Sequence, residues 1–237
     1  MPPDLLFAVM ADAENIKDTA VKVLHCLEKV SSFASSIHPI FGIISSLVGV
    51  ARKGLIKEEG HALDKEFQPL HSELETISKK NSECLMQIHL NEVNETYGKL
   101  DVNIRRQYEA FNDMVKNVKE DPSNTQLHMA AFKKTYWKEK DDMSLDVYYK
   151  GIMGKELLFA KPLLNAYFDS CNGDRKTMEY HCSHIIHLFH MGLIALMGYT
   201  AVAKDDKDEM QKKWAKRVVE IQEKMEAVLS QCKDNSS

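Results

Sequence analysis

The sequence predicts an all-α protein, an elongated multi-helix bundle of about six to eight helices in which long coiled-coil-like helices surround a buried apolar central helix. Three observations predict this fold class. Apolar residues recur at steps of three and four through most of the 237 residues. No long stretch alternates apolar with polar residues as a half-buried strand would. Glycines number only 10 and prolines only 6, which excludes collagen-like and linker-rich architectures.

The first predicted helix spans residues 12–34, because the apolar residues of this segment share one helical face. We interpret residues 1–11 as an N-terminal extension, residues 12–232 as a single helical-bundle domain and residues 233–237 as a frayed tail. No positive charge precedes the short apolar run near the N-terminus, so the sequence indicates no signal peptide. The five cysteines are scattered, which is typical of reduced thiols. We therefore expect a cytoplasmic protein.

Residues 30–51 contain no Asp, Glu, Lys or Arg. We expect Pro39 to break or kink the helix, after which residues 40–51 are apolar nearly all round. Ser35, Gly42 and Gly49 recur every seven residues, and small residues at this spacing let another helix approach closely. The segment fits either a buried core helix or a segment that inserts into a membrane under some condition. Twelve residues are short for spanning the ~30 Å hydrocarbon layer, which takes about 20.

If residues 37–51 do insert, the candidate side chains are Ile37, Ile40, Phe41, Gly42, Ile43, Ile44, Leu47, Val48 and Gly49. Arg52 and Lys53 follow directly, and cations at the end of an apolar helix favour anionic lipid headgroups. The same two residues also fit an ordinary solvated helix end.

Residues 55–119 predict one long helix or two stacked helices, with Pro69 and Gly98 as the places for a kink or break. Apolar residues follow a heptad seam, whose phase slips near residue 90. A seam of this length needs partner helices, either within the chain or from another copy. The seam residues for a helical partner are Phe67, Leu70, Leu74, Ile77, Ile88, Leu100, Ile104 and Phe111.

The second half of the chain predicts five further helices, separated by turn signals. We expect them at 127–138, at 143–153, at 155–169 with a bend near Pro162, after Asp174 with residues 179–203 as the central element, and at 207–232. Asp174 is placed to cap the fourth of these. Residues 180–203 are charge-free for 24 residues, which fits a buried central helix, conditional membrane insertion or a permanent span.

Four histidines stand at steps of three in that charge-free helix: His181, His184, His187 and His190. Neighbours at this spacing share a helical face, while the first and the last point apart. One helix cannot converge the three or four ligands of a full metal site, so we predict no metal. The histidines fit packed, hydrogen-bonded rings. They also fit a pH sensor, since histidine changes charge near pH 6.5.

Composition and motifs exclude several function classes. The net charge of −4 argues against nucleic-acid binding. A basic run at Lys133 and Lys134 is cancelled along the sequence by Glu139, Asp141 and Asp142. No nucleophile elbow, phosphate-binding loop, dinucleotide fingerprint or zinc-protease motif occurs. We predict a protein that is not an enzyme and has no cofactor.

Two phrases of the sequence resemble a known family. They are residues 30–50, with Pro39-Ile40-Phe41-Gly42-Ile43 at their centre, and residues 192–199, Gly-Leu-Ile-Ala-Leu-Met-Gly-Tyr. Together with residues 154–162, residues 173–175 and Trp214, they are similar to the rapunzel family of bony fishes over residues 12–232. The resemblance implies a link to fin and skeletal development and no enzymatic activity. The bundle with a hidden, glycine-bearing apolar segment also resembles α-helical pore-forming proteins, which expose such a segment on a membrane.

These observations lead to two functional hypotheses. In the first, the protein associates conditionally with membrane lipid by exposing residues 37–51, in the manner of a pore-forming protein, and homo-oligomerises through the 63–118 seam. In the second, it is a soluble interaction protein whose 63–118 heptad surface binds a partner helix, and the apolar stretches are plain core.

Overall fold

The computed structural model describes residues 33–54, 62–63, 65, 67–69, 71–72, 91–155, 161–205 and 207–233. Within these ranges every regular element is a helix, which confirms the all-α prediction. In chain order the elements are α2 (Phe33–Lys53), α4 (Asn91–Glu120), the 3₁₀ helix η1 (Pro122–Asn124), α5 (Thr125–Lys138), α6 (Met143–Met153), α7 (Leu163–Ser170), α8 (Arg175–Ala203) and α9 (Lys207–Leu229). The helix expected over residues 12–34 lies almost wholly outside the described residues.

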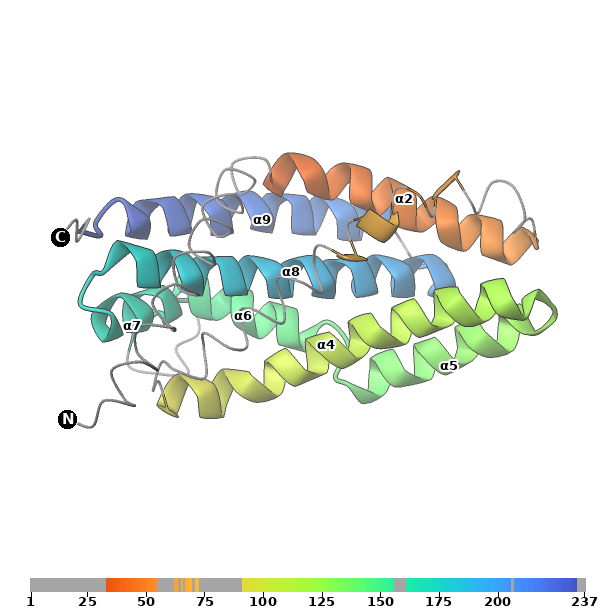
Figure 1. Cartoon of the computed structure of the whole chain (residues 1–237), viewed down its shortest axis with the longest axis horizontal. Coiled ribbons are helices and arrows are strands. Elements are labelled where there is room, and N and C mark those ends of the chain that lie inside the picture. The colour runs from red at the N-terminus through yellow and green to blue at the C-terminus, as the bar shows by residue number, and fades with distance from the viewer. Residues whose placement is uncertain are drawn as a thin grey trace, which may run out of the picture.

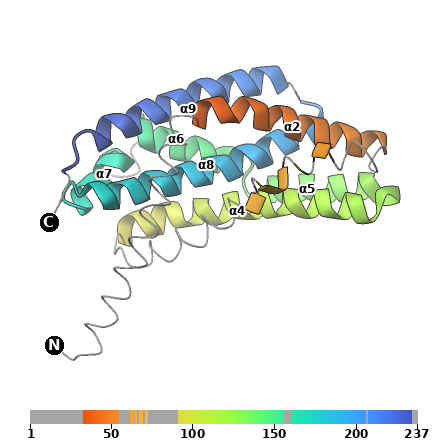
Figure 2. The same cartoon turned by 45° about the horizontal axis from the view of Figure 1, so that its top comes forward.

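The helix α8 runs through the middle of an elongated bundle (Figure 1). It lies between α2 and α9 on one side and the α4–α5 hairpin on the other, an arrangement that also stands out in Figure 2. Contacts join α8 to α2, α4, α5, α7 and α9. A helix covered from all sides needs no polar face, and this explains why nearly all of residues 178–202 are apolar or uncharged and buried. The predicted buried central helix is confirmed.

Two glycines of α8 let its neighbours come close. A Cβ atom at Gly192 would lie 2.5 Å from Leu145 of α6, and one at Gly198 would collide with the ring of Phe111 of α4. The glycines that the sequence marked for close approach in α2 behave differently. Among the described residues, a Cβ atom at Gly42 or Gly49 would meet nothing within 4 Å, so neither glycine lies in a close helix contact there.

The helix α2 continues past Pro39 from Phe33 to Lys53, so of the break or kink expected at this proline the break does not occur. A proline inside a helix removes one backbone hydrogen bond. Farther along α2, Phe41, Ile44 and Leu47 are buried in the core. Their burial offsets the loss of that one bond.

The turns of the C-terminal half follow their local signals. Pro162 directly precedes α7, so the proline starts this helix rather than bending it. Asp174 caps α8 as predicted, because its Oδ1 accepts hydrogen bonds from the backbone N–H and the hydroxyl of Thr177 at 2.8 and 2.7 Å. The N–H of Lys233 donates to the carbonyl of Gly173 at 2.9 Å, which ties the chain after α9 to the α7–α8 turn.

Candidate functional site

The candidate insertion segment forms a two-faced helix in α2. One face, with Phe41, Ile44, Leu47 and Val48, is buried in the core that α2 shares with α8. The opposite face exposes Gly42 and Ser46, with Ile43, Ser45 and Gly49 half-buried at its edges. Ile37 and Ile40 lie in α2, but their side chains are outside the described residues. Between Gly42 and Gly49 the outer face of α2 is therefore uncharged and made mostly of small residues.

The C-terminal ends of α2 and α8 lie side by side. The Arg52 guanidinium donates a hydrogen bond to the carbonyl of Val202 in the last turn of α8. Both helices run in the same direction along the bundle (Figure 1). Within the described part of the chain, α8 has the length and the apolar composition that a helix needs to cross a membrane. In this structure it is almost wholly buried in the bundle. A buried core helix of a soluble protein has the same properties.

The histidines of α8 meet different partners. His181 is fully buried and stacks flat on the ring of Tyr167 of α7, with centroids 4.1 Å apart. Neither of its ring nitrogens makes a hydrogen bond among the described residues. The pKa of His181 is lowered to about 4, mainly by burial and to a smaller extent by the neighbouring His184. His181 is therefore neutral at pH 7.

His184 belongs to a hydrogen-bonded set between α8, α4 and α6. Its Nε2 lies 2.9 Å from Oδ2 of Asp101, and the hydroxyl of Tyr148 donates to the other oxygen of the same carboxylate. The pKa of Tyr148 is raised well above its usual value, mainly by burial and to a smaller extent by the negative charge of Asp101. The carboxylate is thus held between an imidazole and a phenol that stays protonated.

The other two histidines are also kept neutral by burial. Burial lowers the pKa of His187 far below its usual value, and the charge of Arg105 adds to this effect. Burial lowers the pKa of His190 to about 4 against an opposing backbone hydrogen bond at Ile186. Among the described residues, no group of three or more His, Cys, Asp or Glu side chains is arranged to hold a metal ion.

The described part of the predicted seam packs against the chain's own helices. Ile104 and Phe111 of α4 are fully buried, and Leu100 is half-buried. Phe111 meets the rings of Phe67 and Phe132 edge-on, at centroid distances of 6.0 and 5.7 Å. The remaining seam residues lie outside the described residues: Leu70, Leu74, Ile77 and Ile88.

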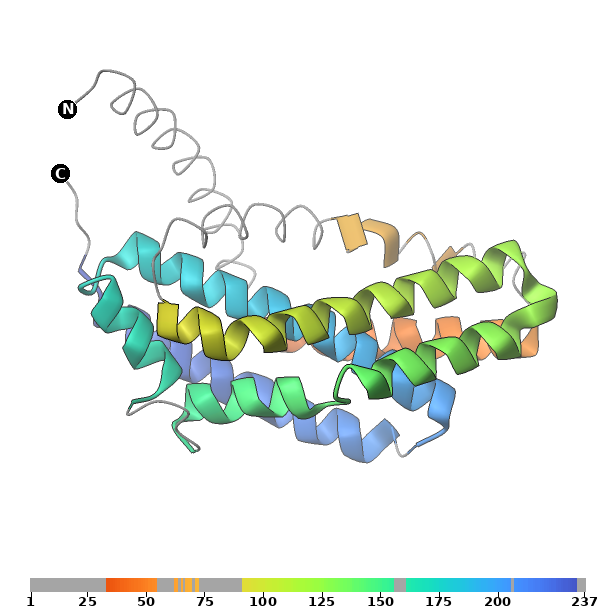
Figure 3. The ribbon, with the colours of Figure 1, turned by 90° about the horizontal axis from the view of Figure 1, so that it is seen from below.

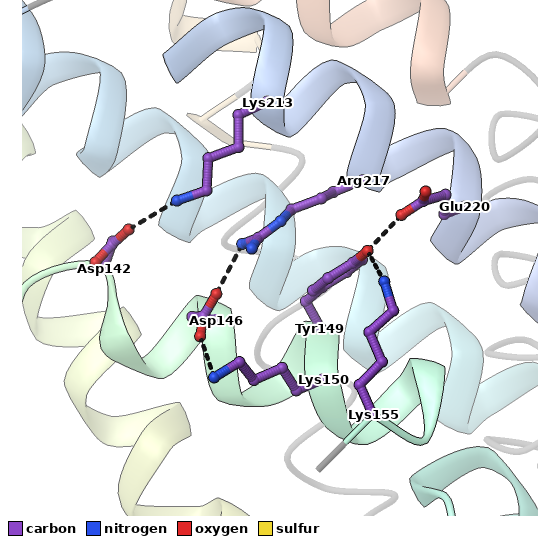
Figure 4. A network of polar contacts seen from close by, with 8 residues as sticks. All are labelled: Asp142, Asp146, Tyr149, Lys150, Lys155, Lys213, Arg217 and Glu220. Atoms are coloured by element: carbon purple, nitrogen blue, oxygen red, sulfur yellow. Dashed lines mark hydrogen bonds and ion pairs between the residues drawn. The ribbon is translucent and has the colours of Figure 1, made fainter. Parts of the chain in front are cut away.

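A polar network joins α6 to α9 (Figure 4), and sequence reasoning did not find it. Arg217 lies over the rings of Tyr149 and Trp214, 4.3 and 4.8 Å from their centroids, and its Nη1 is 2.9 Å from Oδ1 of Asp146. Lys150 contacts the other oxygen of Asp146 at 3.1 Å. The pKa of Asp146 is lowered from its usual value. Partial burial on its own would raise this pKa, but the hydrogen bonds from Lys150 and Arg217 outweigh it.

The same network continues along α9. The hydroxyl of Tyr149 donates to the carboxylate of Glu220 and accepts from Nζ of Lys155 at 2.7 Å. A signal for part of it was present in the sequence, because Trp214, Arg217 and Glu220 stand at steps of three in the last predicted helix. The arrangement fastens two helices together.

The fold and these sites define a class of protein: an all-α bundle built around a long apolar helix that is charge-free over residues 180–203. Residues 56–237 match the family model of the cephalotoxin-like middle helical domain. Over 222 residues the chain is 35% identical to Protein rapunzel of Danio rerio, an alignment that covers 94% of this chain and 96% of that protein. The chain belongs to the rapunzel family, which confirms the resemblance drawn from its sequence. No solved structure matches the chain.

Proposed function

We propose that this protein is not an enzyme and associates conditionally with membranes by releasing α2 from the bundle and inserting residues 37–51 into lipid. The observation that carries the proposal is the outer face of α2. A surface helix of a soluble protein normally presents charged residues to water. The exposed and half-buried positions of α2 from Gly42 to Gly49 offer only glycine, serine and isoleucine.

The apolar side chains of α2 gain a similar free energy from packing in the core and from contact with lipid tails. Removing a side chain such as Phe41, Ile44 or Leu47 from the core to water costs roughly 1.5–3 kcal/mol each. Transfer into hydrocarbon returns a similar amount, because lipid tails are as apolar as the core. Small electrostatic effects then decide between the two states. The match of residues 56–237 to the cephalotoxin-like middle helical domain supports the proposal for the bundle that holds α2, although α2 itself precedes the matched residues.

The histidines of α8 supply a trigger in this proposal. At neutral pH, burial keeps His181, His187 and His190 uncharged. Protonation at low pH requires these rings to reach water, which favours states in which the packing around α8 loosens. The link to fin and skeletal development forms part of the proposal through family membership alone.

Dye release from liposomes tests the proposal at pH 7.4 and pH 5.5, with purified full-length protein and vesicles of phosphatidylcholine and phosphatidylserine. The decisive variant is Gly42→Leu/Gly49→Leu, since a Cβ atom at either position meets no described residue within 4 Å in the folded bundle. We expect it to lose release, because small residues allow close helix contact within the bilayer. Gly98→Leu in α4 is the matched control, since a Cβ atom there also meets no described residue within 4 Å.

A variant with glutamine at all four histidines tests the trigger. If wild-type protein releases dye only at pH 5.5 and the glutamine variant fails there, the histidines are the trigger. If the protein neither releases dye nor floats with vesicles at either pH, the apolar stretches are plain core. The second hypothesis, a soluble partner-binding protein, then takes its place, and the partner search begins at residues 63–118.

A further inference from the structure

The helix α5 is a positively charged element in an acidic chain. Its 14 residues include three lysines and no aspartate or glutamate, whereas the whole chain has a net charge of −4. It lies on the outside of the bundle beside α4, as the view from below shows (Figure 3). Helical periodicity puts Leu127, Lys134 and Lys138 in one outward stripe, with Trp137 at its edge. Leu127 and Trp137 are 65% and 60% exposed.

The acids that cancel these lysines along the sequence do not cancel them in space, which corrects the sequence-based interpretation. The carboxylate of Glu139 is turned inward, buried and 3.5 Å from Arg106 of α4. Asp142 faces Lys213 of α9 at 3.7 Å. Asp141 is partly buried, and burial together with Asp142 raises its pKa.

The turn after α5 fixes this separation of charges. Gln107 of α4 is buried, and its side-chain NH2 group donates to the backbone carbonyls of this turn. Its Nε2 lies 3.3, 3.1 and 2.6 Å from the carbonyl oxygens of Tyr136, Glu139 and Asp141. Lys140 and Asp141 adopt the left-handed conformation in the same turn. Within the described part of the chain, no ion pair engages the lysines of this surface: Lys133, Lys134, Lys138 and Lys140.

Trp137 is held in place although most of it is exposed. Its indole Nε1 donates to the hydroxyl of Tyr199 of α8 at 2.6 Å, and the two rings meet edge-on at 6.4 Å. Tyr199 in turn stacks on Tyr136 at 4.5 Å. The polar atom of the indole is therefore satisfied inside the protein, and the exposed part of the ring has a fixed direction.

We propose that the outward face of α5, made of Leu127, Lys134, Trp137 and Lys138, docks on an anionic lipid bilayer. The bilayer offers what this face needs, because phosphate and carboxylate headgroups meet the ammonium groups while the adjacent acyl layer takes the indole and leucine. Tryptophan is the side chain that favours this boundary. The inference rests on the proposed function, for which it supplies the first, peripheral step before α2 moves.

Vesicle flotation of the full-length protein at pH 7.4 tests the docking surface. The vesicles contain phosphatidylcholine with or without phosphatidylserine, in low and high salt. For Lys134→Gln/Trp137→Ala/Lys138→Gln we expect a loss of affinity of roughly tenfold or more for the anionic vesicles. The matched control is Lys212→Gln/Lys216→Gln/Val219→Ala on α9, whose residues are also exposed and which removes the same charge. We expect it to bind like the wild type.

Tryptophan fluorescence gives an independent readout. The chain has two tryptophans, and Trp214 is fully buried, so a blue shift on adding vesicles reports the transfer of Trp137 from water. Equal binding by both variants, equal binding to vesicles without phosphatidylserine, or no blue shift overturns the docking surface. If the protein binds no vesicles at all, the docking surface is overturned as well, even if the protein binds a nucleic acid or an acidic protein.

The two proposals fail in different ways. Binding that depends on the α5 face without any dye release leaves the docking surface in place and overturns insertion of α2. Undiminished binding and release by the α5 variant overturns the docking surface and leaves insertion in place.

Discussion

At the scale of a single residue, His181 makes stability depend on pH. Its pKa is lowered to about 4 by burial, against 6.5 in the unfolded chain. Between these values the unfolded state binds more protons, so stability is fully present above pH 6.5 and falls as the pH drops toward 4. The slope is about 1.4 kcal/mol per pH unit for one such histidine.

We predict that His181→Phe flattens this dependence. Phenylalanine keeps a ring on Tyr167 and no longer titrates, so the variant should lose about 1.5 kcal/mol less than the wild type between pH 6.5 and pH 5. Urea unfolding at a series of pH values measures the effect. An unchanged slope would show that His181 is hydrated in the folded protein.

The partners of the histidines could not be predicted from the sequence. The spacing identified the four histidines as a set, because periodicity is local information. Asp101, Tyr148 and Tyr167 come from three other helices, and only the packed fold brings them to α8. The direction of Glu139 is a similar case, because a buried glutamine of another helix sets it.

At the scale of an element, two kinds of helical glycine should respond in opposite ways to alanine. Gly42→Ala adds a Cβ atom on α2 that meets no described residue within 4 Å, so we expect a gain of about 0.5–1 kcal/mol from helix propensity. Gly198→Ala collides with Phe111, so we expect a loss of about 1–3 kcal/mol. The shift of the urea midpoint measures both, and a stabilising Gly198→Ala would contradict the close approach of α4 and α8.

The contact between α6 and α9 should depend on the shape of Arg217 as well as on its charge. Arg217→Lys keeps the charge beside Asp146 but loses the planar group over Tyr149 and Trp214. We expect a loss of about 1–2 kcal/mol. Lys216→Arg on the exposed side of α9 is the control and should change stability by less than about 0.5 kcal/mol. If both variants unfold at the same urea concentration, the ring contacts contribute nothing.

Element positions followed from sequence where the signals were local. Periodicity and turn residues placed α6 at its observed bounds, and the start of α8 at Asp174 followed from the capping rule. At Pro39 the sequence left a break and a kink open, and the local rule could not exclude the break, because burial of apolar side chains farther along α2 outweighs it. Small residues signalled close approach in α2, yet the structure shows it at Gly192 and Gly198 of α8.

At the scale of the whole molecule, the proposed insertion is a competition between the closed bundle and the bilayer. The bundle stays closed as long as the contacts of α2 with α8 and α9 outweigh its affinity for lipid. Any contact made only in the closed state therefore shifts this balance for the entire protein. The hydrogen bond from Arg52 to the carbonyl of Val202 is such a contact, since it joins the ends of α2 and α8.

We predict that Arg52→Lys makes the protein more active on anionic vesicles. The charge that attracts headgroups stays, while the forked group that reaches Val202 is lost. A hydrogen bond from a charged group is worth about 1.5–3 kcal/mol, so dye release at pH 7.4 should rise by roughly tenfold or more. Lys53→Arg, at the exposed neighbouring position, is the control and should leave release unchanged. If Arg52→Lys lowers the urea midpoint but releases dye at the wild-type rate, then separation of α2 from α8 does not limit insertion, and the opening must start at another interface of the bundle.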